Sequence, residues 1–160
     1  PLRGNINTRL NKRHEFDAII LAAAGLNRMG FNNYITQILP ITQLLPAAGQ
    51  GALGLECRDN DQALIELISK LSCKQTQGCV LAERGVIQYL QGSCQVPLAA
   101  FAQLENSAIK LNALVGHDDG THLIKATSAD NLNLDPLQLG HSVAKQLLAQ
   151  GAQEILNKYL

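Results

Sequence analysis

The sequence predicts an α/β chain in two parts: a partial parallel α/β domain, then a small C-terminal α+β domain with a three-stranded antiparallel sheet covered by helices. A continuous apolar run at 17–23 predicts the first part, because a strand buried on both faces of a parallel sheet lacks polar alternation. Beyond Pro97, apolar residues recur at every second position, which is typical of antiparallel strands with one covered face. Helical periodicity in the sequence before and after these strands predicts the helices that cover the sheet.

Residues 1–48 form the first predicted segment. Asn5 is suited to cap a short helix over 6–13, because its side-chain oxygen can accept a free backbone N–H. After the apolar run, residues 25–30 predict a turn and a short helical piece. Residues 40–48 are rich in Pro, Leu and Ala and carry no charge, which indicates a packed crossing segment.

Residues 49–72 form the second predicted segment, and they begin with a glycine pattern. The run Gly49-Gln-Gly-Ala-Leu-Gly54 matches Gly-x-Gly-x-x-Gly, but a dinucleotide site needs a strand before it and a helix opening inside it. Residues 53–57 instead predict a strand after it. We therefore favour glycines that let two backbones approach closely at a domain crossing. A helix then begins near Asp61, with these apolar residues on one face: Leu64, Leu67, Ile68 and Leu71.

Residues 73–160 form the third predicted segment, a self-contained α+β domain. It opens with a helix over 74–90 and continues as a meander of three strands, 97–104, 109–115 and 122–127. Asp135-Pro136 predicts a helix start, with proline at the first helical position. That helix ends near Gly151, and a last short helix follows it.

Composition and charge disfavour several classes of protein. Lysine plus arginine and aspartate plus glutamate both total 13, and a general nucleic-acid binder is normally basic. The longest apolar run, 18–26, is too short to span a bilayer. We therefore expect no nucleic-acid partner and no membrane span. The chain opens at Pro1 in what resembles the end of a strand, so we expect it to be part of a longer protein.

The four cysteines are at positions 57, 73, 79 and 94, and their spacing matches no zinc pattern. We therefore expect no metal site. The chain is not cysteine-dense and shows no signal peptide, which favours free thiols in the cytoplasm, although a disulfide pair remains an alternative.

Cys94 lies in a distinctive stretch. The predicted helix stops at Gly92, and Pro97 prevents helix from continuing, so the thiol is placed on a short connection between a helix and a strand. Such a connection suits covalent attachment. The alternative is that Cys94 is a small buried apolar residue, as many unpaired cysteines are.

The motif Glu83-Arg84 with Val86, Leu90 and Gly92-Ser-Cys-x-Val-Pro-Leu-Ala99 resembles the signature of porphobilinogen deaminases (hydroxymethylbilane synthases). Three further runs resemble other parts of the same family: Arg3-Gly-Asn-x-x-Thr-Arg9, Asp17-Ala-Ile-Ile-Leu-Ala-x-Ala-Gly-Leu-x-Arg28, and Leu45-Pro-Ala-x-Gly-Gln-Gly-Ala-x-Gly-x-Glu-Cys57-Arg. The resemblance covers nearly the whole chain.

This resemblance implies a transferase of tetrapyrrole (porphyrin and heme) biosynthesis. Such enzymes join four porphobilinogen units head to tail with release of ammonia, and the chain grows on a dipyrromethane cofactor held by a cysteine thioether. The matching cysteine is Cys94. The resemblance also assigns 1–48 to half of a substrate-binding domain, 49–72 to a return segment of the N-terminal domain, and 73–160 to the cofactor-carrying domain. We expect the full-length enzyme to be a monomer.

The resemblance also assigns arginines to ligands. Arg3 and Arg9 match cofactor-binding positions, and Arg9 and Arg28 match substrate-binding positions. Guanidinium groups suit these roles, because pyrrole acetates and propionates are carboxylates that accept paired hydrogen bonds. The plainer alternative for each is a solvated surface arginine. Arg84 could instead pair with Glu83.

No catalytic residue is assigned in this chain. The family's catalytic aspartate lies in the N-terminal part of the enzyme, and Asp17 matches a strand start and not that acid. We therefore expect the chain to be inactive alone, with the N-terminal portion as its partner. Two other functions remain open: a non-catalytic carrier or interaction domain, and a dinucleotide-binding enzyme that uses Gly49 to Gly54.

Overall fold

The computed structural model describes residues 2–92, 96–131 and 135–159 of the chain. The chain divides into two compact units, Pro1–Pro40 and Ile41–Leu160. No helix among the described residues has both the length and the apolar character needed to cross a membrane.

The first unit contains only short helices among its described residues. They are α1 (Ile6–Asn11), α2 (Ala23–Arg28) and two 3-10 turns, η1 (Arg13–Glu15) and η2 (Asn32–Tyr34). Asn5 caps α1 as predicted, because its Oδ1 accepts the backbone N–H of Thr8 at 2.8 Å. Leu10 and Leu26 are its buried apolar residues.

The predicted strand over 17–23 is wrong for this chain. Residues 18–22 form no strand, the last residue of the run already belongs to α2, and Ile20 remains 68% exposed. A strand of a parallel sheet needs neighbouring strands to take its hydrogen bonds, and the described part of this unit offers none. The described residues therefore form no parallel sheet, and their one sheet is antiparallel.

The second unit begins with a segment that holds one helix, α3 (Gln62–Ser69). Asp61 caps it, with Oδ1 accepting the N–H of Leu64 at 3.2 Å. The predicted strand over 53–57 is wrong, because these residues pair with no other strand, and Leu53 and Leu55 are 75% and 61% exposed. The apolar face predicted on α3 is present but also exposed, with Leu67 at 61%.

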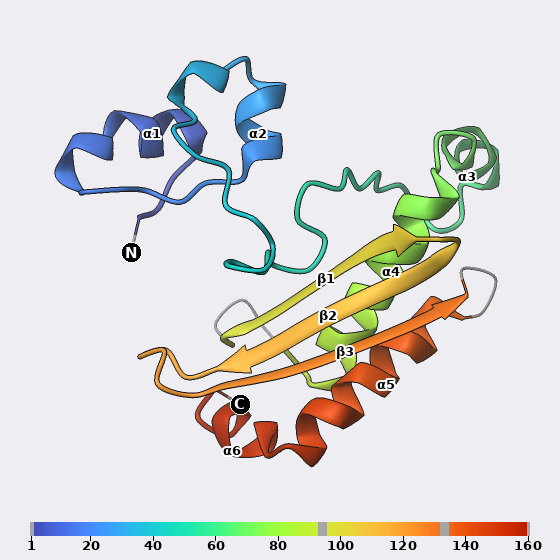
Figure 1. The fold of residues 1–160 in the computed structure, drawn as a ribbon. Helices are drawn as coiled ribbons and strands as arrows, with labels where there is room; N and C mark the ends of the chain where they lie inside the picture. Colours follow the sequence, from blue (N-terminus) through green and yellow to red (C-terminus); the bar gives the residue numbers. More distant parts are fainter. Residues whose placement is uncertain (1, 93–95, 132–134, 160) are drawn as a thin grey trace. The chain divides into compact units, whose positions relative to one another are not determined.

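The predicted meander is confirmed (Figure 1). Its strands are β1 (Leu98–Glu105), β2 (Ala108–Gly116) and β3 (Leu123–Asn131), in the order β1-β2-β3 with antiparallel neighbours. Glu105 faces Ala108 across a two-residue turn, and both turn residues have positive φ, 50° at Asn106 and 68° at Ser107. This backbone matches the right-handed twist of the strands that it joins.

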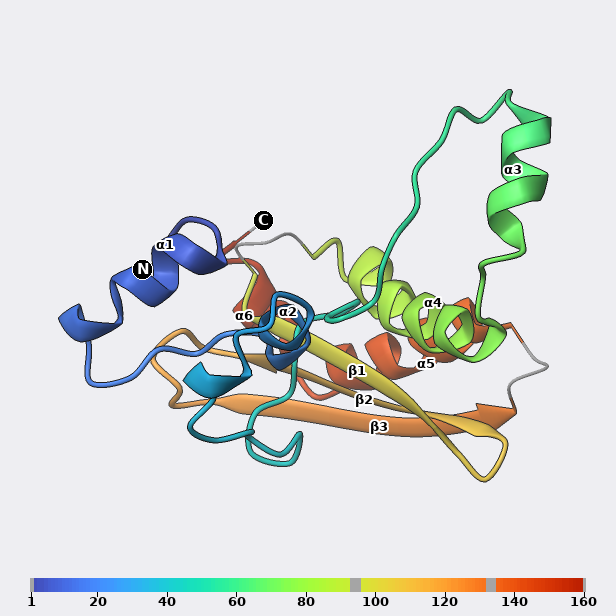
Figure 2. The ribbon, with the colours of Figure 1, turned by 90° about the horizontal axis from the view of Figure 1, so that it is seen from above.

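Three helices complete the domain: α4 (Lys74–Tyr89), α5 (Pro136–Ala149) and α6 (Ala152–Leu156). Figure 2 shows α4 and α5 on the same face of the sheet. The inward side chains of the strands and helices form one core, whose largest fully buried members are Ile109, Leu111, Leu147, Ile155, Leu156, Val86, Val115 and Val143. The predicted starts and ends of α4 and α5 are confirmed, including the cap by Asp135.

Helices α4 and α5 approach each other at two glycines. A Cβ added to Gly85 would lie 2.7 Å from the carbonyl oxygen of Leu137 and 3.1 Å from the Cα of Gly140. A Cβ added to Gly140 would collide with the carbonyl oxygen of Ala82. The backbones of the two helices are thus in direct contact, which only glycine at both positions permits.

Candidate functional site

The connection between α4 and β1 carries the cysteine that the sequence singles out. Cys94 lies outside the described residues, which stop at Gly92 and resume at Val96. On the helix side, Gln91 adopts a φ of 52° and the N–H of Gly92 donates to the carbonyl oxygen of Ile87 at 2.8 Å, which ends α4. In the sequence, Cys94 lies between Tyr89, the last residue of α4, and Leu98, the first residue of β1.

Glu83, eleven positions before Cys94, is the buried charged side chain of the described core, with 4% of its surface exposed. Its Oε2 accepts the backbone N–H of Gly49 at 2.6 Å, and its Oε1 accepts that of Ala102 at 2.8 Å. Burial raises the pKa of Glu83, and the two hydrogen bonds act in the opposite direction. The pairing of Arg84 with Glu83 is not formed, because the Arg84 side chain is exposed to solvent.

The burial of Glu83 and its two backbone partners were not predicted from the sequence. A sequence signal for the burial was nevertheless present, because Cys79, Glu83, Val86 and Leu90 recur at the three- and four-residue spacing of one helix face. An acid on an otherwise apolar face must find partners for its oxygens. The identity of these partners could not be predicted, since Gly49 lies 34 positions away along the chain.

Residues 47–52, here called the crossover turn, run past this carboxylate. Gly49 and Gly51 have φ values of 72° and 85°, and the N–H groups of Gln50 and Ala52 donate to the carbonyl oxygens of Ala47 and Gly49. The run therefore forms two successive turns where a dinucleotide fingerprint requires a helix. An open cleft of about 380 Å³ lies between this turn, α4 and β1.

The three predicted ligand-binding arginines all belong to the first unit. Arg3 and Arg28 are exposed, and the Nε of Arg9 donates to the carbonyl oxygen of Gly4 at 2.8 Å. Within residues 2–40, none of the three is ion-paired with a carboxylate. Arg13 differs, because its guanidinium lies 5.2 Å from the ring centroid of Tyr34, a contact that the sequence did not indicate.

The other three cysteines are free thiols. Cys73 is exposed beside the first turn of α4, and hydrogen bonds from Thr76 lower the pKa of its thiol. Cys79 is half-buried in the cleft beside the crossover turn, and burial, followed by the charge of Glu83, raises the pKa of its thiol. Of these two thiols, Cys73 is therefore the one inclined to ionise.

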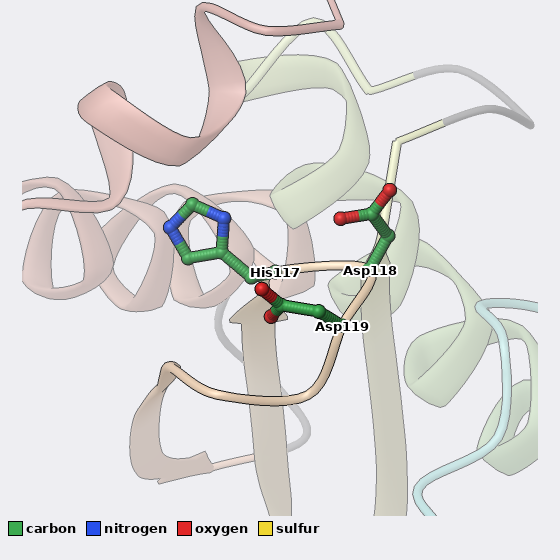
Figure 3. Close-up of side chains that lie close together, drawn as sticks. All are labelled: His117, Asp118 and Asp119. Atoms are coloured by element: carbon green, nitrogen blue, oxygen red, sulfur yellow. The ribbon is translucent and has the colours of Figure 1, made fainter.

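His117, Asp118 and Asp119 gather at the turn after β2, with their potential ligand atoms within 4.8 Å of one another (Figure 3). Two interactions already account for this cluster. Oδ1 of Asp119 accepts hydrogen bonds from the N–H and the hydroxyl of Thr121, and Nζ of Lys158 lies 3.2 Å from Nδ1 of His117. An ammonium group beside the histidine opposes a second cation there, so we assign the cluster to the turn itself.

The described residues after α3 define a small α+β domain, and the sequence puts Cys94 between its helix α4 and its strand β1. Comparison with known families places this domain. The family model "porphobilinogen deaminase, dipyromethane cofactor binding domain" matches residues 1–66, and "porphobilinogen deaminase, C-terminal domain" matches residues 78–149. The chain therefore belongs to the porphobilinogen deaminase family.

Curated relatives agree with this assignment. The porphobilinogen deaminase of Brevibacillus brevis is 48% identical over 162 residues, which covers 99% of this chain and 52% of the relative. That of Desulforamulus reducens is 41% identical over 159 residues, which covers 98% of this chain and 51% of the relative. That of Bacillus thuringiensis is 48% identical over 159 residues, covering 97% and 50%. The chain thus spans about half the length of the curated relatives that it matches.

Proposed function

We propose that this chain is the C-terminal portion of a hydroxymethylbilane-forming transferase, which condenses four porphobilinogen units head to tail and releases ammonia at each step. The observation that carries the proposal is the match of two successive family models along this chain, together with the Cys94 signature between α4 and β1. The product is a linear tetrapyrrole that leads to porphyrins and heme. We place the enzyme in the cytoplasm and expect the full-length protein to be a monomer.

We propose that Cys94 carries the dipyrromethane cofactor through a thioether. When bound, this group supplies the pyrrole end on which the chain grows. The residues of this chain fit such a group, because the sequence has a thiol between α4 and β1, and arginines of the first unit have guanidinium groups that pair with no described carboxylate of that unit. Arg3 and Arg9 would bind the carboxylates of the cofactor, and Arg9 and Arg28 those of the substrate.

The proposed division of the chain is 1–48 as half of the substrate-binding domain, 49–72 as the return segment of the N-terminal domain, and 73–160 as the cofactor-carrying domain. Exposed leucines support the assignment of 49–72 as a return segment of another domain. Leu53, Leu55, Leu67 and Leu71 are 75%, 61%, 61% and 74% exposed. Such a density of exposed apolar side chains within 19 positions is typical of a surface that packs against another domain.

In the test, this chain is incubated with porphobilinogen and with the N-terminal half of the Brevibacillus brevis relative, added as a separate polypeptide. The peptides of this chain are then mapped by mass spectrometry. We expect a dipyrrole adduct on the peptide that contains Cys94, and no adduct after Cys94→Ser. An adduct on Cys57, Cys73 or Cys79 would refute the assignment. A chain that takes up no adduct but still binds the N-terminal half would instead indicate a carrier or interaction domain. Micromolar binding of a nicotinamide or flavin dinucleotide would instead favour a dinucleotide-binding enzyme that uses Gly49 to Gly54.

A further inference from the structure

Glu83 is buried without a cation. In the described part of the chain no lysine, arginine or histidine forms an ion pair with it, and its two oxygens are taken by two backbone N–H groups. Burying a lone carboxylate is costly, so its hydrogen bonds must serve the fold or the function. The chain uses this carboxylate to join two segments that no other described hydrogen bond connects, the crossover turn and the edge of the sheet.

The partner on the sheet is an edge strand. β1 pairs with β2 on one side only, and the N–H of Ala102 donates to Glu83 on its other side. An open edge N–H is a template for unwanted strand pairing. The carboxylate therefore covers this position of the β1 edge from within the same domain.

The partner on the other side is the crossover turn. Ala48 packs against the core, and the following residue, Gly49, presents its N–H to Oε2 of Glu83. Gly49 adopts a φ of 72°, a conformation that an L side chain rarely accepts. Cys79, one helical turn before Glu83, lines the same cleft, so its thiol lies beside the docked turn.

We propose that Glu83 is a positioning residue that docks the crossover turn onto α4 and the β1 edge. The turn then moves as one body with the helix that leads to Cys94. Loss of both acceptor oxygens would leave the part-buried N–H of Gly49 and the buried N–H of Ala102 without partners. Undocking of the turn lets both N–H groups bind water, because water then enters the cleft. The inference does not depend on the proposed function, because its test involves no porphobilinogen and no cofactor.

The experiment uses Cys79 as a reporter in the full 160-residue chain. Wild type, Glu83→Met and Glu66→Met are treated with N-ethylmaleimide, and labelling is followed at each cysteine peptide by mass spectrometry. Methionine keeps the length of the side chain and removes both acceptors. Glu66 is an exposed glutamate of α3 and serves as the matched control. Because burial and, after it, the charge of Glu83 itself raise the pKa of the Cys79 thiol, labelling rates are compared per thiolate, with the thiolate fraction taken from the pH dependence of labelling in each variant. We expect this corrected rate at Cys79 to rise about tenfold in Glu83→Met, as the loss of a charged hydrogen bond implies, with Cys57, Cys73 and the control unchanged.

Amide exchange at Leu111 and Val143, in the core, shows whether Glu83→Met is folded. A folded Glu83→Met with wild-type labelling of Cys79 would overturn the proposal. If Glu83→Met is unfolded, amide exchange in the wild-type chain shows whether the crossover turn is docked. Docking predicts that the N–H of Gly49 exchanges slowly, like that of Ala102. Exchange of Gly49 as fast as that of the exposed Gly54 would overturn the proposal in that case.

Discussion

Glu83 and Ala102 are 19 positions apart in the chain, yet the N–H of Ala102 donates to Oε1 of Glu83 at 2.8 Å. This bond joins the middle of α4 to the outer edge of β1. With the second bond, from Gly49, it accounts for both oxygens of a carboxylate inside an apolar core. The desolvation of that carboxylate raises its pKa.

Stability should depend on the ionisation of Glu83. Its folded pKa is raised above the unfolded value, because burial outweighs the hydrogen bonds from Ala102 and Gly49. Between these two pKa values the folded chain holds more protons than the unfolded chain. The contribution of Glu83 to the free energy of unfolding is therefore fully present below the unfolded pKa, about 4.3, and is lost as pH rises through the folded pKa.

The measurement is the free energy of unfolding in urea from pH 4 to 8 for wild type and Glu83→Gln. The wild-type value minus the variant value should fall with pH, by about 1.4 kcal/mol for each unit between the two pKa values. Subtracting the variant removes the opposite contributions of Glu105 and Asp119, whose pKa values are lowered by hydrogen bonds. A difference that rises with pH would show that hydrogen bonding outweighs burial at Glu83.

The contact between α4 and α5 should tolerate no side chain. Gly140→Ala places a methyl group against the carbonyl oxygen of Ala82, so the helices must separate. Overpacking of this kind costs about 1–3 kcal/mol. Gly54→Ala is the matched control, because nothing lies within 4 Å of its added Cβ. Urea unfolding gives the free energy of unfolding of both variants. Equal stability of the two would contradict direct backbone contact at Gly140.

Patterns within the sequence predicted the helices and the three antiparallel strands of the second unit because those elements are locally encoded. Asp61 and Asp135 cap their helices, alternation sets the strands, and two residues close the first hairpin. The strands at 17–23 and 53–57 failed because a strand is completed by neighbours, and apolar character alone does not supply them. The partners of Glu83 could not be predicted for a similar reason. They are backbone groups, which every residue carries, and the fold selects among them.

Arg9 and Arg28 should bind the carboxylates of the growing chain. Arg→Leu at either position, tested in this chain with the N-terminal half of the Brevibacillus brevis relative, should slow the consumption of porphobilinogen. Each charge-assisted hydrogen bond contributes roughly 1.5–3 kcal/mol, so the expected loss in kcat/KM is about ten- to hundredfold. Lys70→Leu, which removes an exposed cation after α3, should leave turnover unchanged. Unaltered turnover in both arginine variants would assign them to the solvated surface.

The chain on its own should not form hydroxymethylbilane. Deamination needs an acid beside the leaving amine, and a well-placed acid contributes about 10²–10⁴-fold. Glu83 is the carboxylate nearest to Cys94 on its N-terminal side, but both of its oxygens already accept backbone N–H groups. Asp17, in the first unit, is exposed to solvent. A bilane-forming assay with the chain alone and with the N-terminal half of the relative should give turnover only in the second case. Turnover by the chain alone would show that another carboxylate of this sequence acts as the acid, and replacement of each Asp and Glu by its amide would then identify it.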